Sequence, residues 1–262
     1  MRRWALLLAV VLAACDTPFE PRVEDGPAFA LFGTLDGRSK VQSLRVQDLA
    51  SSVFATPDQL AAAVTSTELT SGRTTVWRDS LVTLASGDRA HLFLADLAVA
   101  PGETHRIEAV RTSDGATSAA TVSLPSPTVA ARPPIQKTTA VQVDVAALSG
   151  RLDSPVVRYR VRRPDGLDDA SFTAVAVPQG EGEAVTFTAF LQTAKTRAEA
   201  ILYSGNMGET VLVDARLEGT VVSTEPAAVR NGAGGVAWAV PISIPIPFAV
   251  ESLQQVGFID GR

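Results

Sequence analysis

Apolar and polar residues alternate along much of the chain in short segments, a period of two that is typical of β-strands with one buried face. Turn residues such as Gly, Pro and Asp separate these segments at regular intervals, which favours a sandwich or barrel over alternating strands and helices. No segment shows a helical period long enough to compete. The pattern predicts an all-β fold with strands over residues 28–35, 41–49, 61–69, 74–84, 89–94, 104–112, 117–124, 140–146, 156–163, 171–177, 183–191, 198–203 and 210–222.

The third of these segments has a helical alternative. Thr56 can cap a first helical turn that contains Pro57, and Gln59 would complete a capping box. We favour a strand over residues 61–69, because pairing with neighbouring strands overrides weak local preference.

Turn chemistry supports the strand assignment. Asp36-Gly37 and Asp114-Gly115 lie between apolar runs, where such pairs favour hairpin turns with positive φ. Pro101-Gly102 suits a type II turn, because Pro fixes φ at the first central position and Gly accepts positive φ at the second. Residues 101–125 resemble the closing hairpin of immunoglobulin-like or transthyretin-like modules, and this resemblance implies a β-sandwich.

Two proline-rich motifs, Pro125-Ser126-Pro127 and Arg132-Pro133-Pro134, mark the best boundary in the chain. Prolines make such a segment stiff and extended, as in linkers between domains. We therefore expect two tandem β-sandwich domains over residues 27–125 and 138–262, joined by a linker over 126–137.

Large apolar residues alternate with prolines in the C-terminal segment 240–248. Proline cannot donate a hydrogen bond to a strand ladder, so this segment is expected to be an edge strand or a polyproline-like stretch. Its apolar side chains would form a stripe of a size that usually marks a partner site if it were exposed. We predict that the segment packs into the folded core.

The N-terminus has the three-part layout of a secretory signal. Arg2 and Arg3 precede a short apolar stretch over residues 4–12, and two small alanines follow. The stretch is too short for a membrane-spanning helix, which needs about 20 apolar residues. The motif Leu12-Ala13-Ala14-Cys15 resembles the lipobox of bacterial lipoproteins, and Cys15 is the only cysteine in the chain.

The resemblance implies cleavage before Cys15, with an S-diacylglyceryl group on its thiol and an N-acyl chain such as palmitate on its new amino group. Residues 1–14 would then be the signal peptide, and residues 15–26 the lipidated cysteine and a flexible tether. More than one acyl chain gives stable membrane attachment. The alternatives are an ordinary signal peptide followed by a coincidental cysteine, or a buried N-terminal helix. We expect the protein to be located in the cell envelope, and we favour the outer membrane. The inner membrane is the alternative, because Asp16 resembles an inner-membrane retention signal.

Charge and composition limit the classes of partner that the chain is expected to bind. The formal net charge is −5, and loss of the first 14 residues would remove two arginines and make the chain more acidic. An acidic chain without a basic run is a poor nucleic-acid binder, because phosphate neutralisation supplies most non-specific affinity. A single cysteine forms no intramolecular disulfide and no cysteine-rich zinc site. We expect the membrane and another envelope protein as partners, and no small-molecule cofactor.

No residue stands out as catalytic. The chain has two histidines, His91 and His105, and neither lies in a loop beside an evident partner. A GxSxG nucleophile motif is absent. The glycine cluster at 232–235 has no lysine and no following helix, as a phosphate-binding loop would need.

Two patterns remain as candidate sites. Arg158, Arg160 and Arg162 alternate with apolar residues, which places the three arginines on one strand face as a possible anion or partner patch. The alternative is a solvated face balanced by acids on a neighbouring strand. The carboxylates of Asp165, Asp168 and Asp169 cluster in a turn and make a weak calcium candidate; we expect no metal there, since the spacing is not that of an EF-hand.

As a whole, the chain resembles envelope lipoproteins that combine a lipobox with β-sandwich modules. This resemblance implies a membrane-anchored, non-catalytic binding or assembly module of unknown ligand. The alternative is an envelope hydrolase with an unrecognised active site, which a screen against esters, glycosides and peptides would reveal.

Overall fold

The computed structural model describes residues 27–50, 58–126, 128–131, 140–146, 150–179, 185–204 and 208–261. Strands dominate, so the predicted all-β class is confirmed. Among the described residues only α2 (Leu191–Leu202) and α3 (Val250–Gln255) are helices. None of the helices there is long and apolar enough to cross a membrane. The strands are β1 (Phe29–Asp36), β2 (Val41–Asp48), β3 (Ala62–Glu68), β4 (Thr74–Val76), β5 (Arg78–Thr83), β6 (Arg89–Asp96), β7 (Thr104–Arg111), β8 (Thr117–Ser123), β9 (Thr128–Ala131), β10 (Ala140–Ala146), β11 (Gly150–Arg162), β12 (Asp169–Val175), β13 (Val177–Gln179), β14 (Val185–Phe190), β15 (Thr210–Ser223), β16 (Ala227–Arg230), β17 (Gly232–Pro245) and β18 (Phe258–Asp260).

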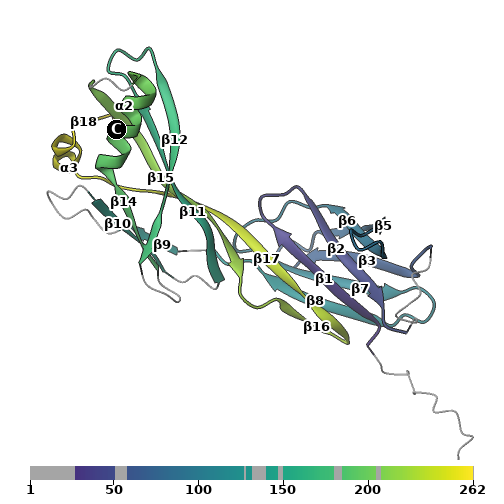
Figure 1. Cartoon of the computed structure of the whole chain (residues 1–262). Helices are drawn as coiled ribbons and strands as arrows, with labels where there is room; N and C mark the ends of the chain where they lie inside the picture. The colour runs from purple at the N-terminus through teal and green to yellow at the C-terminus, as the bar shows by residue number, and fades with distance from the viewer. Residues whose placement is uncertain are drawn as a thin grey trace, which may run out of the picture.

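The first lobe is a sheet that nearly closes on itself (Figure 1). Its strands follow the order β4-β3-β7-β8-β16-β17-β1-β2-β6-β5. The two end strands, β4 and β5, are neighbours in sequence and meet at Trp77, which is only 4% exposed and donates its Nε1–H to Ser66 Oγ at 3.0 Å. A single predicted strand over 74–84 is therefore broken at this buried corner.

The turns of this lobe confirm part of the turn chemistry. Gly102 has φ +85° and Glu103 N–H donates to Ala100 O at 3.2 Å, as a type II turn requires. Gly115 also has positive φ. Gly37 does not, so its expected role is corrected: a Cβ on Gly37 would lie 3.0 Å from Pro241 Cδ, and glycine is needed there for close approach.

The second lobe combines two sheets and both helices. In the larger sheet β11 lies between β12 and β15, and β15 pairs on its other side with β18 at one end and β17 at the other. The smaller sheet has the order β13-β14-β10-β9. Helix α2 follows β14 directly and contacts β10 of the smaller sheet and β11, β12 and β15 of the larger, so it joins the two layers.

One strand, β17, belongs to both lobes. From Gly232 to Ala239 it runs parallel to β1 in the first lobe, and from Ala239 to Pro245 it pairs antiparallel with β15 in the second (Figure 1). The preceding strand β16 pairs with β8 as well as with β17. Residues 227–239 therefore complete the first lobe, and the expected division into two sandwiches that are each continuous in sequence does not describe this chain.

Two further expectations differ from the structure. The linker expected over 126–137 contains strand β9, which pairs with β10, while residues 132–139 lie outside the described residues. The strand expected over 198–203 is wrong, because those residues lie in or next to α2. Its buried positions Leu191, Ala194, Lys195 and Ala198 follow the i, i+3, i+4, i+7 spacing of a helix face.

Candidate functional site

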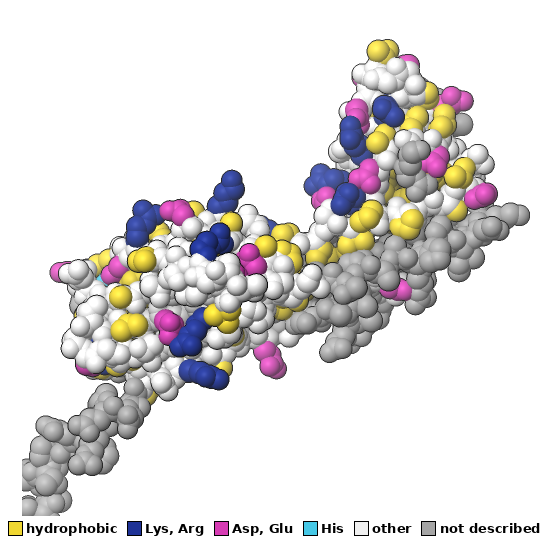
Figure 2. Space-filling model, turned by 180° about the vertical axis from the view of Figure 1, so that it is seen from behind, with side chains coloured by type: hydrophobic (Ala, Val, Ile, Leu, Met, Phe, Trp, Pro, Cys, Tyr) yellow, Lys and Arg dark blue, Asp and Glu magenta, His cyan; other side chains and the backbone are white. Residues whose placement is uncertain are grey.

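A groove of about 720 Å³ lies where the two lobes meet. Figure 2 shows hydrophobic side chains gathered along the surface between the lobes. A volume of this size falls within the range of ligand sites, and the lining is mostly apolar, as in such sites. The described residues that line it are Pro101, Ser126, Leu212, Asp214, Ala215, Pro241, Ile242, Ser243, Ile244, Pro245, Ile246, Pro247 and Phe248.

The main wall of the groove is the C-terminal half of β17. Ile242, Ile244, Ile246 and Phe248 are at most 8% exposed, so the prediction that this segment packs into the core is confirmed. Among the described strands, β17 pairs here with β15 alone, which also agrees with the predicted edge strand. The isoleucines face inward with Leu217, and the residues between them face outward.

The prolines sit where a strand edge tolerates them. Pro241 is opposite Thr220 and Pro245 is opposite Arg216. Proline cannot occupy a hydrogen-bonded pair, so these are the pairs whose backbone groups point away from β15. Ile246 N–H, one residue on, donates to Ala215 O of β15 at 2.8 Å and confirms the alternation. The groove edge of β17 therefore offers carbonyl groups at both prolines and no N–H at either.

Asp214 is the charged residue among the described groove-lining residues. Its side chain is 42% exposed, and Arg216 Nη1 lies 3.8 Å from its Oδ2. Arg216 is mainly engaged elsewhere: its Nε donates to Ser243 Oγ at 2.8 Å and its Nη2 to Ser243 O at 3.2 Å. Arg160 of β11 is paired opposite Asp214, and the charge of Asp214 contributes to raising the pKa of Arg160 after the larger effect of Asp169. The carboxylate therefore lies near two arginines.

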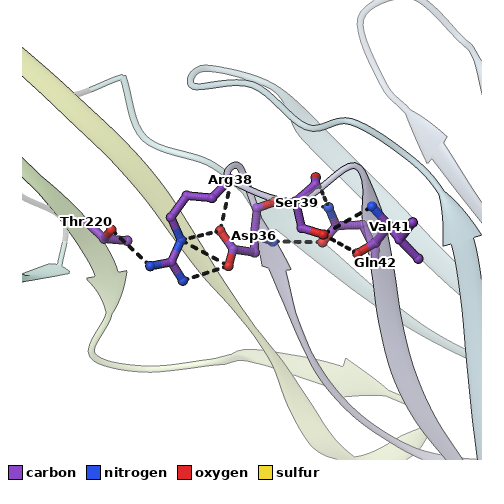
Figure 3. A network of polar contacts seen from close by, with 6 residues as sticks. All are labelled: Asp36, Arg38, Ser39, Val41, Gln42 and Thr220. Atoms are coloured by element: carbon purple, nitrogen blue, oxygen red, sulfur yellow. Dashed lines mark hydrogen bonds and ion pairs between the residues drawn. The ribbon is translucent and has the colours of Figure 1, made fainter.

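A polar cluster fixes the first lobe against the second beside this groove (Figure 3). Arg38 donates to both carboxylate oxygens of Asp36, with Nε 2.9 Å from Oδ1 and Nη2 2.7 Å from Oδ2. Its Nη1 donates to Thr220 Oγ1 of β15 at 3.3 Å. The hydrogen bond from Arg38 lowers the pKa of Asp36. Buried Gln42 donates to Leu97 O at 3.0 Å and accepts from Asp36 N–H at 2.8 Å. We call Asp36, Arg38 and Thr220 the interlobe latch.

The three arginines of the predicted patch lie on one face of β11, as expected. Val157, Tyr159 and Val161 are buried on the other face. Burial raises the pKa of Tyr159, whose ring stacks on Phe172 with centroids 5.3 Å apart.

Two of these arginines have acidic neighbours on adjacent strands. Arg158 Nε lies 2.8 Å from Glu218 Oε2, and Arg160 Nη2 lies 2.7 Å from Asp169 Oδ2, a hydrogen bond that raises the pKa of Arg160. In Figure 2, basic and acidic side chains lie close together on the second lobe. This is the balanced face of the alternative interpretation for Arg158 and Arg160. Arg162, at the end of the same face, contributes to lowering the pKa of Asp169 after the larger effect of Arg160.

In the turn that contains Asp165 and Asp168, both carboxylates are paired with Arg163. Arg163 Nη2 lies 2.9 Å from Asp165 Oδ2, and its Nη1 donates to Asp168 Oδ2 at 3.3 Å. Asp169 is paired with Arg160, as described above. No group of three or more potential metal-ligating side chains occurs in the part of the chain that the structure describes.

Both histidines have carboxylate partners, contrary to expectation. His91 Nδ1 lies 2.9 Å from Asp79 Oδ1, and His105 Nε2 lies 2.9 Å from Glu103 Oε2. Sequence reasoning missed the first pair because Asp79 lies on the neighbouring strand β5. The second pair was open to prediction, because Glu103 lies two positions before His105, the spacing that places two side chains on one face of an extended chain. The two histidines are 3% and 0% exposed, so they are core residues of the first lobe.

The remaining sequence features are accounted for in two ways. The glycines at 232–235 lie in β17 and not in a loop. Gly234 has φ +85° and packs beneath the ring of Phe32, so a side chain there would collide with β1. Cys15, the predicted lipidation site, lies outside the described residues.

Comparisons with known proteins add little to this geometry. The sequence matches no protein-family model, and no curated protein matches it. Among solved structures, the pullulanase of Anoxybacillus sp. LM18-11 aligns with a TM-score of 0.26 and 8% identity over 77% of this chain and 25% of that chain. The same enzyme complexed with maltotriose gives the same TM-score, identity and coverage. The chain thus spans about a quarter of the pullulanase, and the likeness carries no functional argument.

Proposed function

We propose that this chain is a membrane-anchored envelope lipoprotein, held at the outer membrane by lipid on Cys15. It would act as a non-catalytic binding or assembly module. Its ligand would be a segment of another envelope protein, taken up in the groove between the lobes. The observation that carries the binding proposal is that groove, with its apolar wall from β17, its own carboxylate and its contributions from both lobes.

The start of the fold suits a tether that carries the molecule. Ala28 N–H donates to Asn231 O at 3.0 Å, and Ala28 O accepts from Leu49 N–H at 3.1 Å and from Arg111 Nη2 at 3.0 Å. Phe29 pairs with Gly232 at the beginning of β17, at the end of the first lobe that is far from the second. A lipid on the N-terminal side would leave the groove well away from the anchored end.

The lipid anchor is tested by Cys15→Ser. Because the thiol is the acceptor of the diacylglyceryl group, this variant should keep its first 14 residues, run larger on a gel and take up no alkyne fatty acid in cells. The wild-type protein is the control. If the wild type is unlabelled and matures like the variant, the lipoprotein proposal is wrong.

The groove is tested in the native host with a photo-reactive amino acid in place of Ser126, which is exposed at the groove. The matched control carries it at Ser113, an exposed turn residue of the first lobe. We expect an adduct to one envelope protein from position 126 alone. That protein, once identified and purified, should bind the wild type and fail to bind a Ser126→Trp variant. Equal adducts at both positions, or no adduct, would contradict the binding proposal.

A further inference from the structure

The start of the first lobe and the second lobe are connected by two strands that run side by side. β1 begins at Phe29, where the chain enters the first lobe, and runs parallel to β17 toward the second lobe (Figure 1). Beyond Ala239 the same strand β17 continues into the second lobe, where it pairs with β15. A pull between the N-terminal side of the chain and the second lobe therefore acts on the start of β1 and on the far end of β17.

Such a pull loads the two strands in shear. Because the forces act at opposite ends of parallel strands, β1 and β17 must slide along each other, and all the hydrogen bonds between them resist together. The register is unbroken over the eight residues of β1, from Phe29 opposite Gly232 to Asp36 opposite Ala239. We call this pairing the β1–β17 clamp. Forces applied at one and the same end of a strand pair instead open it one position at a time.

Contacts outside the ladder reinforce the loaded start of β1. Phe29 N–H donates to Ser118 Oγ at 2.9 Å, and this hydroxyl donates to Asn231 O at 2.6 Å, next to the start of β17. Arg111 Nη2 donates to Ala28 O at 3.0 Å. Ser118 is fully buried and the Arg111 side chain is 11% exposed. In such surroundings a hydrogen bond is stronger than in water.

The other end and the inner side of the clamp are closed as well. Gly37 N–H donates to Ala239 O at 2.8 Å, one position beyond the last pair of the register. Phe29, Leu31 and Val236 are fully buried on the inner side. Water therefore has no access to the ladder from the core, and it does not replace a strained hydrogen bond from that side.

From this geometry we infer that the first lobe carries tension between the membrane anchor and a partner held by the second lobe, and that the β1–β17 clamp bears it. The barrier to unfolding governs how a protein yields to force. A clamp whose bonds must break together raises that barrier for a pull along the molecule, while the same lobe stays easier to open from its side. The resistance belongs to the fold, and its use in the envelope rests on the proposed function.

The test compares two pulling directions on the full chain in an atomic force microscope. Cell-free synthesis leaves Cys15 with a free thiol, which is attached to the surface. The cantilever is attached through an azide-bearing amino acid at position 251 in α3, just past β17, or at position 50, just past β2. The replaced residues, Glu251 and Ala50, are both exposed. The first pair of attachments loads the clamp in shear. The second pulls at the open end of the β1–β2 hairpin, where Phe29 lies opposite Asp48.

The measured quantity is the rupture force at a fixed loading rate, sorted by the length of chain released. We expect a force at least about twofold higher for attachment at position 251 than at position 50, because all pairs of the clamp share the load in the first case and one pair carries it in the second. Equal forces in the two directions would overturn the inference.

A substitution at the loaded end locates the resistance. Ser118→Ala removes the hydroxyl that joins Phe29 to Asn231, so the pull from position 251 should need less force. The matched control is Ser123→Ala, because Ser123 is an exposed residue of the same strand whose hydroxyl accepts from Thr104 Oγ1. An unchanged force in Ser118→Ala would show that the start of β1 does not bear the load. The comparison of pulling directions leaves the clamp unsubstituted, so it decides the inference even if Ser118→Ala does not fold.

The outcomes separate this inference from the proposed function. Equal forces in the two directions refute the clamp and leave the proposed function to be decided by fatty-acid labelling and by cross-linking from position 126. A high force along β17 in a chain that takes up no fatty acid in cells would support the clamp and contradict the lipid anchor.

Discussion

Replacing Ile244 by alanine should destabilise both lobes together. Ile244 is 7% exposed and lies opposite Leu217, which is fully buried. A large-to-small change at such a site costs about 2–5 kcal/mol, because the lost contacts leave a cavity. With about 2–4 °C per kcal/mol for a chain of this size, a loss of about 3 kcal/mol lowers the melting temperature by roughly 6–12 °C. Since β17 is shared, the first lobe should lose stability as well.

Thermal melts of the full-length protein measure the shift, and hydrogen exchange read by mass spectrometry assigns it to each lobe. The control is Val250→Ala, because Val250 is 42% exposed and such surface changes usually stay within about 0.5 kcal/mol. A fall of less than about 2 °C for Ile244→Ala would refute the assigned packing. Faster exchange in the second lobe with unchanged protection around Phe93 would refute the coupling through β17.

Three further predictions concern single contacts. The Ser71 side chain and the backbone N–H groups of Thr70 and Ser71 hold the pKa of Glu68 at about 2, against a usual 4.5. The resulting stability is present above pH 4.5 and lost as the pH falls to about 2, so the melting temperatures of wild type and Glu68→Gln should differ at pH 7 and converge near pH 2. Melts with calcium and with chelator should superimpose, because Arg163 holds the turn carboxylates; a shift of several degrees would overturn this. Arg38→Ala should broaden the distance distribution between spin labels, one in each lobe; an unchanged width would show that the interlobe latch does not fix the lobes.

Local patterns predicted most strands correctly because an alternating buried face is a local property. The turn at Pro101-Gly102 followed for the same reason, since its two residues set their own φ values. The Asp36-Gly37 hairpin was placed correctly for a partly wrong reason. Glycine is needed at position 37 because Pro241 packs closely against it. Pro241 is about 200 residues away in the chain, so no local pattern contains that contact.

Helix α2 was missed because a lysine occupies one of its buried positions. Lys195 is 5% exposed, and its Nζ donates to Glu199 Oε1 at 2.6 Å and to Gly208 O at 2.8 Å. These partners satisfy the ammonium group, so burial is tolerated. Counting Lys195 as a core position would have revealed the helix spacing between Leu191 and Ala198, but the sequence alone does not show which lysines are buried.

The sequence predicted separate features of the candidate site but not the groove that they form together. The prolines of segment 240–248 predicted an unpaired edge, and the isoleucines predicted burial, which together describe one wall of the groove. The opposite wall comes from Pro101 and Ser126, which the sequence assigned to a turn and a linker. Only the continuation of β17 from β1 to β15 brings the two walls together. The existence of the groove therefore depends on a long-range pairing, while the proline pattern along one of its walls is a local property of the sequence.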